Sequence, residues 1–278
     1  MSVDVDQMDE EFGCMGIHEK HKTNKGKGRD YVTVGNYEEL QLAIAAYDKI
    51  SIAVSQGSFH FYDDIVITNK QVEIYPAKEG QMPTFLSHGK NPLFTVEGGR
   101  CKLAITGIRF CNPASCKPDD PEREDNGNIV CRNGADVTCT RCKFLSNCVN
   151  GVVVTGVSKA LFMLCEFNAH ANGLKVVESE VTCLNCNFLF SKWYHIRADY
   201  SVIYLEECKL QYSDASGSIV VHMDFENRNE IRIYNTEFLR PAIIEIAIFH
   251  SNGSVEDFNS DGSRTFSKTV QFDDNYLV

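Results

Sequence analysis

The 278-residue chain carries 27 basic and 38 acidic side chains, which give a formal net charge of −11 at pH 7. Such an acidic surface argues against nucleic acid, whose phosphates attract positive charge, and against anionic membranes. The hydrophobic fraction of 43% is ample for a buried core. No apolar run is long enough for a secretory signal or a membrane span. From the charge and this absence together, we expect neither nucleic acid nor membrane as a partner.

Residues 1–30 are polar and divide by charge, with acidic residues first and basic residues from Lys20 onward. Because this segment lacks the apolar residues that would anchor it to a core, we predict a flexible polar tail. The alternative is a docking peptide that becomes ordered on a partner.

A short helix is predicted near residues 36–46. Asn36 can cap its first turn, Glu39 stands at the capping-box position, and Leu40 and Ile44 share one face. Such a helix can cover the open end of a stack of strands, which would otherwise expose unpaired backbone groups. Alternating apolar residues predict strands next, over residues 50–54, 65–67 and 72–74.

One pattern, apolar-x-apolar-x-x-(apolar or Cys)-x-aromatic, recurs six times within residues 103–238. The alternation predicts a strand, and the extra residue between the two pairs predicts a bend where the strand restarts. The closing residues of successive copies are 34, 23, 21, 22 and 28 residues apart, a spacing typical of a solenoid. The copies are Leu103/Ile105/Ile108/Phe110, Val137/Cys139/Cys142/Phe144, Ala160/Phe162/Cys165/Phe167, Val181/Cys183/Cys186/Phe188, Ile203/Leu205/Cys208/Leu210 and Ile231/Ile233/Thr236/Phe238.

A third strand precedes several copies, at residues 152–155, 174–177, 196–199 and 219–222. Asn-Gly pairs open two of these segments and suit tight corners, because both residue types tolerate a positive φ. Each coil is therefore predicted to hold three short strands. Two insertions, at 112–127 and near 224–230, predict loops on one face, and residues 250–278 are predicted to form a C-terminal cap.

The predicted helix, followed by ISIAVSQGSFHF and DIVITNKQVEIYP, resembles the opening of right-handed parallel β-helix proteins of the pectin-lyase-like superfamily. The resemblance covers roughly residues 31–250 and concerns architecture. It implies an all-β fold, with residues 31–278 forming a single right-handed parallel β-helix of three strands per coil. The superfamily includes lyases, esterases, hydrolases, viral tailspikes, capsid-associated proteins and non-catalytic adaptors, so the fold alone does not define an activity.

Two Cys-x-x-Cys pairs, Cys139/Cys142 and Cys183/Cys186, have the spacing of a four-thiolate zinc site. The repeat places these residues in columns with apolar residues, and two coil steps of about 4.8 Å separate the pairs. That separation is too large for one metal, so we predict core packing, no metal and no cofactor. Free cysteines buried in this way indicate a reducing location, intracellular (cytoplasmic) or within a virion.

The outward positions of the third strands, and the turn just before residues 196–199, provide the candidate binding residues. A cation, a carboxylate and an imidazole on a rigid sheet can recognise a carboxylate or abstract a proton, and an aromatic ring can stack on a sugar. The alternative is a solvated face with cross-strand pairs. The candidates are Lys175, Trp193, Tyr194, Arg197, Asp199 and His222.

Valines interrupt these outward columns at positions 153, 177 and 220, and apolar patches edged by charge often mark protein contacts. The signature motifs of pectin-degrading members are also missing. We therefore favour a non-catalytic scaffold for protein–protein contacts, either an intracellular adaptor that binds signalling proteins or a structural component of a large virus particle that binds capsid proteins. The alternative is a carbohydrate-active enzyme (lyase, esterase or hydrolase) with Lys175, Arg197, Asp199 and His222 as catalytic residues.

Overall fold

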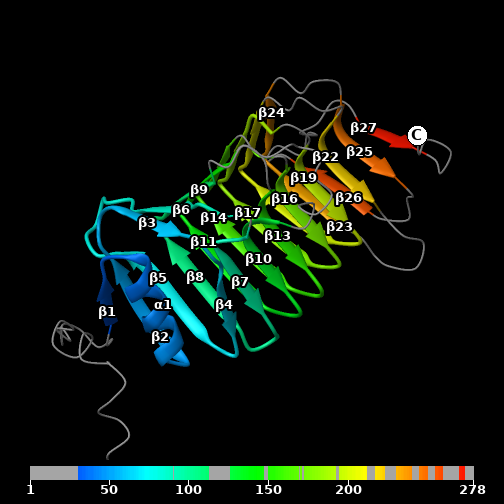
Figure 1. Cartoon of the computed structure of the whole chain (residues 1–278). Coiled ribbons are helices and arrows are strands. Elements are labelled where there is room, and N and C mark those ends of the chain that lie inside the picture. The colour runs from blue at the N-terminus through cyan, green and yellow to red at the C-terminus, as the bar shows by residue number, and fades with distance from the viewer. Residues whose placement is uncertain are drawn as a thin grey trace, which may run out of the picture.

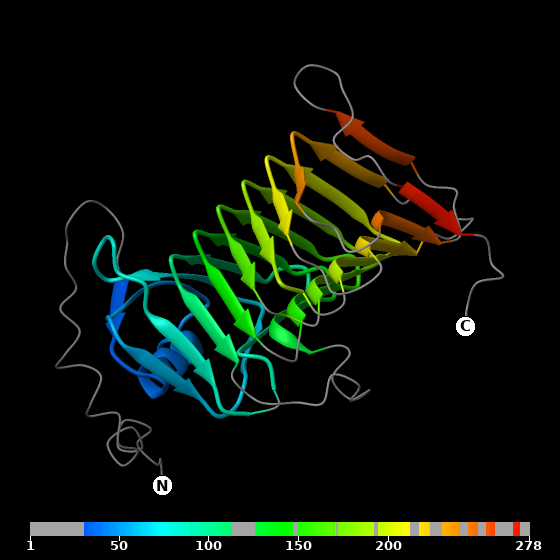
Figure 2. The ribbon, with the colours of Figure 1, turned by 90° about the horizontal axis from the view of Figure 1, so that it is seen from above.

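The computed structural model describes residues 31–89, 91–112, 126–146, 150–168, 170, 172–191, 194–211, 217–222, 230–239, 244–249, 254–258 and 269–272. The predicted tail at residues 1–30, Trp193, and most of the predicted loop at 112–127 and cap at 250–278 lie outside this part of the chain. The described strands form three parallel sheets, and successive coils follow one another along a single direction from blue to red (Figures 1 and 2).

Each coil contributes one strand to each sheet. The first sheet contains β1 (Tyr31–Val34), β2 (Lys49–Val54), β5 (Gln71–Pro76), β8 (Lys102–Thr106), β11 (Asp136–Thr140), β14 (Lys159–Met163), β17 (Glu180–Leu184), β20 (Val202–Glu206), β23 (Glu230–Tyr234) and β26 (Ser254–Phe258). The second contains β3 (Ser58–Phe61), β6 (Thr84–Ser87), β9 (Arg109–Asn112), β12 (Lys143–Ser146), β15 (Glu166–Asn168), β18 (Asn187–Leu189), β21 (Lys209–Gln211) and β24 (Glu237–Leu239). The third contains β4 (Ile65–Thr68), β7 (Phe94–Glu97), β10 (Gly127–Arg132), β13 (Asn150–Thr155), β16 (Asn172–Val177), β19 (Tyr194–Asp199), β22 (Gly217–His222), β25 (Ile244–Phe249) and β27 (Thr269–Phe272).

The register of the strands reproduces the columns of the sequence repeat. Val137 pairs with Leu103 on one side and Ala160 on the other in the first sheet. Phe144 pairs in the same way with Phe110 and Phe167 in the second sheet. The predicted all-β fold, a right-handed parallel β-helix with three strands per coil, is therefore confirmed.

Stacked phenylalanines fill the core beneath the second sheet. The rings of Phe110, Phe144, Phe167 and Phe188 are buried, and successive centroids lie 4.9, 4.8 and 4.7 Å apart with interplanar angles of 5°, 9° and 4°. These separations match the spacing of neighbouring strands, about 4.8 Å. Aromatic pairs stabilise a fold by about 0.5–1.5 kcal/mol beyond the area that they bury, so the stack favours this register over any other.

Single residues in the left-handed conformation turn the chain from one sheet to the next. Between the first and second sheets, Arg141, Leu164 and Asn185 have φ values of 54°, 56° and 54°. Their backbone N–H groups donate to carbonyls of the following coil, as Leu164 does to Leu184 at 2.9 Å. One residue can therefore bend the strand while the pairing of the coils continues.

Helix α1 (Tyr37–Ala46) packs at the N-terminal end, beside β1 and β2 (Figure 1), which confirms the predicted helix. Asn36 caps it by accepting a hydrogen bond from the Glu39 N–H at 2.8 Å, and Leu40 and Ile44 are buried in the core. At its other end, the ammonium of Lys70 donates to three carbonyls of residues 44, 45 and 47 at 2.8–3.1 Å. Among the described residues, no helix is long and apolar enough to cross a membrane.

Val157 is expected to destabilise its corner, because a β-branched residue at φ 62° costs about 1–2 kcal/mol and this side chain is 77% exposed. The Val157→Asn substitution should therefore raise the free energy of unfolding by about 1 kcal/mol, measured from the urea midpoint at unchanged slope. Val66→Asn is the control, since Val66 is also exposed but lies in β4, where Asn is unfavourable. Stabilisation by both substitutions, or by neither, would contradict this account.

Candidate functional site

The third sheet aligns the predicted site residues. Lys175 on β16 pairs with Arg197 on β19, and Asp199 on β19 pairs with His222 on β22. Their column neighbours are Val153 beside Lys175 and Val177 beside Asp199. The two predicted outward columns therefore exist, with neighbouring strands about 4.8 Å apart.

These outward residues are far from fully solvated. Lys175 is only 5% exposed, and Val153 beside it and Val130 on the next strand are also buried. Burying an ammonium group is unfavourable unless polar or charged groups surround it. The alternative of a solvated face with ordinary cross-strand pairs is therefore wrong at Lys175.

Arg197 and Asp199 form an ion pair beside the buried Lys175. The Arg197 Nε lies 3.4 Å from the Asp199 Oδ2, and their side chains are 28% and 14% exposed. Charges in such positions are screened by water less than charges on an open surface. The pair thus places a guanidinium and a carboxylate next to Lys175, where a small part of each remains accessible to a ligand.

Tyr194 is half-buried at the start of β19, in register with Asn172. Below it, the Asn172 amide donates to the Asn150 side-chain oxygen at 2.8 Å, so a hydrogen-bonded ladder supports this corner. The side chain of His222 and the whole of Trp193 lie outside the described residues, so their roles stay predictions.

His195 lies on β19, two residues before Arg197, and was not among the predicted site residues. It is fully buried, and its Nδ1 lies 2.8 Å from the Ser191 hydroxyl. Burial lowers the pKa of His195 to about 3, although the backbone of Gln211 acts in the opposite direction. The imidazole is therefore neutral near pH 7, and its ring lies against Phe188 of the core, with centroids 6.2 Å apart.

Together, the described residues of the site can bind and polarise an anionic or carbonyl group. Lys175 and Arg197 supply cations, and a guanidinium is well suited to a carboxylate or carbonyl oxygen. Asp199 supplies a carboxylate that can accept a proton from water or from a hydroxyl group. Because these groups stand on strands rather than on loops, their spacing is fixed by the sheets.

The first sheet carries a second feature, a shallow hollow of about 390 Å³ on its outer face, which the sequence did not predict. Two ion pairs line it, Lys102–Asp136 at 3.4 Å and Lys159–Glu180 at 2.6 Å. Their side chains are 42–65% exposed. Exposed pairs of this kind contribute little to stability, and the hollow lacks the buried charges of the third sheet.

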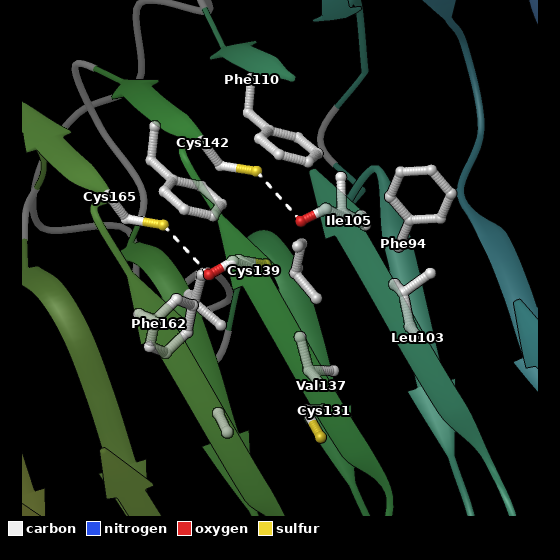
Figure 3. Packing of buried hydrophobic residues seen from close by; sticks show 14 of the residues in the cluster. Phe94, Leu103, Ile105, Phe110, Cys131, Val137, Cys139, Cys142, Phe162 and Cys165 are labelled. Carbon is white, nitrogen blue, oxygen red and sulfur yellow. Dashed lines mark hydrogen bonds between the residues drawn. The ribbon is translucent and has the colours of Figure 1, made fainter. Parts of the chain in front are cut away.

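The cysteine columns form part of the core, as predicted. The Cys142 Sγ lies 3.5 Å from the Ile105 carbonyl and the Cys165 Sγ lies 3.4 Å from the Cys139 carbonyl, and both contacts are drawn as dashed lines in Figure 3. Nine cysteines of the described chain are free, and burial raises the pKa of the Cys139 thiol. No group of three or more His, Cys, Asp or Glu residues in the described chain is arranged to hold a metal ion.

Comparisons with known proteins agree with the fold. No family model matches the sequence, and no curated protein matches it. Among solved structures, the chain is similar to pectin methylesterase PemA from Erwinia chrysanthemi, with 10% identity over 90% of this chain and 92% of that chain and a TM-score of 0.49. It is also similar to a deglycosylated pectin methylesterase from Aspergillus niger, with 11% identity over 89% and 94% of the two chains and a TM-score of 0.34. At this identity the likeness concerns the fold alone, which the three parallel sheets of the chain already define.

The preferred hypothesis of a non-catalytic scaffold, in an adaptor or a virus particle, is contradicted. Both similar structures are titled pectin methylesterases, and neither is titled an adaptor or a virus-particle protein. The error has a physical reason, since that hypothesis treated the outward valines as an exposed apolar patch. Of these valines, Val153 is buried and Val177 is half-buried within the single chain, so they present little apolar surface to a partner, and the side chain of Val220 lies outside the described residues.

Substituting the cysteines tests core packing against zinc binding. Cys165→Ser and Cys183→Ser should each reduce the free energy of unfolding by about 1–3 kcal/mol, because a hydroxyl then occupies a buried place where a larger thiol packed. Denaturant unfolding of both variants, with and without chelator, measures this. A large loss for Cys183→Ser alone, together with sensitivity of the parent protein to chelator, would instead identify a zinc site in the cysteine pairs.

The buried His195 predicts a specific sensitivity to acid. Its pKa is about 3 in the folded state and near 6.5 when unfolded, so the unfolded state takes up the proton first as the pH falls. The contribution of His195 to stability is complete above about pH 6.5 and declines by about 1.4 kcal/mol per pH unit below it. Urea unfolding at pH 7, 6 and 5 should show a smaller decline for His195→Gln than for the parent protein. Equal declines would refute this assignment.

Proposed function

We propose that this protein is a carbohydrate-active enzyme whose site is the outward face of β16 and β19 in the third sheet. The observation that carries the proposal is the group of Lys175, Arg197 and Asp199, whose charged side chains lie together and largely buried on a rigid sheet. Burial of three charged groups is costly, and such groups gather mostly where a ligand or a reaction requires them.

The roles follow from the chemistry of the three side chains. Arg197 and Lys175 bind the oxygen of a substrate carbonyl and stabilise the negative charge that develops on it. Asp199, held beside Arg197, acts as the nucleophile or as the base that activates water. Tyr194, on the same strand, provides an aromatic side chain near the bound sugar.

The charge of the protein supports a neutral substrate. A net charge of −11 repels a polyanionic sugar, whereas an esterified saccharide carries no such charge and still presents a carbonyl to the two cations. We therefore place ester hydrolysis on a saccharide ahead of cleavage of free polyuronates. The nine free cysteines of the described chain support a reducing, intracellular location, where that substrate would be met.

Asp199→Asn tests the proposal most directly, because it keeps the shape of the side chain and removes its charge. We expect release of acid from methyl- or acetyl-esterified oligosaccharides by the parent protein, and a loss of about 100-fold or more in kcat for the variant. Lys175→Met should also lower kcat/KM. Hydrolysis of free polyuronates should be slower than that of the esters.

Asp136→Asn provides a matched control. Asp136 pairs with Lys102 at the same distance, 3.4 Å, but on the first sheet. Its substitution should leave turnover unchanged. The proposal fails if the parent protein turns over no member of an ester, uronate and neutral oligosaccharide panel, or if Asp199→Asn retains full activity.

A further inference from the structure

Two exposed histidines face one another across the first two coils. His60 lies on β3, and His88 directly follows β6, which pairs with β3. The His60 Nδ1 and the His88 Nε2 are 2.6 Å apart, so one nitrogen donates a hydrogen bond to the other. Both side chains are exposed, so solvent and dissolved ions reach the pair.

The backbone holds both residues in place. Phe59 and Phe61 point into the core on either side of His60, which fixes the outward direction of its ring. The N–H of His88 donates to the Phe61 carbonyl at 2.8 Å, so the turn after β6 is tied to β3.

A third ring restricts the motion of the pair. The ring of Tyr62 lies nearly parallel to that of His88, with centroids 5.1 Å apart and an angle of 17°, and the His88 and His60 rings meet edge to edge, with centroids 4.9 Å apart and an angle of 16°. The Tyr62, His88 and His60 rings thus form one contiguous group on the surface. Binding of a ligand to the two imidazoles therefore costs less side-chain entropy than it would if both rings rotated freely.

We propose that His60 and His88 form a binding site for a divalent transition-metal ion of the zinc type. Imidazole is the common protein ligand of such ions, through either ring nitrogen, and two nitrogens that converge from neighbouring strands offer two coordination positions. Because no third His, Cys, Asp or Glu joins them in the described chain, water completes the coordination.

Only a small movement is needed for metal binding. A tetrahedral ion with bonds of about 2.0–2.1 Å holds two nitrogens a little over 3 Å apart, somewhat farther than in the hydrogen-bonded pair. Rotation of the two exposed side chains accommodates this change while the strands stay paired. The bound ion then links the first coil to the second and keeps open positions for a further ligand.

The test is calorimetric titration of the folded full-length chain with ZnCl₂ in a non-chelating buffer. Cys14, His18 and His21 lie close together in the sequence and offer competing ligands, so a Cys14→Ser/His18→Ala/His21→Ala variant serves as the parent. We expect one zinc per chain, and a loss of affinity of about tenfold or more for His60→Gln and for His88→Gln, since second-shell changes alone cost 10–100-fold. In NMR spectra of the parent variant, zinc should shift the ring signals of two histidines. These zinc-induced shifts should be absent in His60→Gln and His88→Gln.

Tyr62→Leu is the matched control, because it removes the neighbouring ring and keeps both imidazoles. It should retain zinc binding at reduced affinity, while circular dichroism confirms that every variant is folded. The proposal is overturned if the parent variant binds no zinc, or if His60→Gln and His88→Gln bind as well as the parent.

Discussion

The pairing of each coil with the next in a fixed register is the constraint on which the rest of this structure depends. In the first sheet, for example, Cys139 lies between Ile105 and Phe162, and all three point into the core. A shift of one residue would turn every inward side chain of a strand to the surface, so burial of the core selects one register. The phenylalanine stack strengthens this selection, because its rings meet face to face only when the coils are aligned.

The register also explains why much of the fold could be predicted. A residue such as Phe144 has its pairing partners one period away in the sequence, so the repeat itself names the neighbours in space. The corners were harder to predict, because the left-handed residue points outward and its side chain is not constrained by packing. Arg141, Leu164 and Asn185 occupy equivalent corners, and no common residue type marks them.

The candidate site could be predicted only in part, for a related reason. The pairing of Lys175 with Arg197 follows from the repeat, and so does that of Asp199 with His222. The burial of Lys175 and Val153 does not follow, because alternation tells which way a side chain points and not what lies over it. That missing information led to the scaffold hypothesis, since an outward valine was taken for an exposed one. The facing of His60 and His88 was missed because His88 lies in a turn outside the repeat.

The same architecture places different chemistry on different parts of one surface without conflict. In a solenoid each coil contacts only its neighbours, so stability is close to a sum of local terms. The histidine pair joins the coils of β3 and β6, whereas the ion pair of Arg197 and Asp199 stands on β19, several coils away. A bound metal would therefore stabilise the first coils without altering the spacing of Lys175 and Arg197, which their own strands determine. Any coupling between the two sites has to come from a ligand long enough to touch both, because the sheets transmit alignment only from one coil to the next.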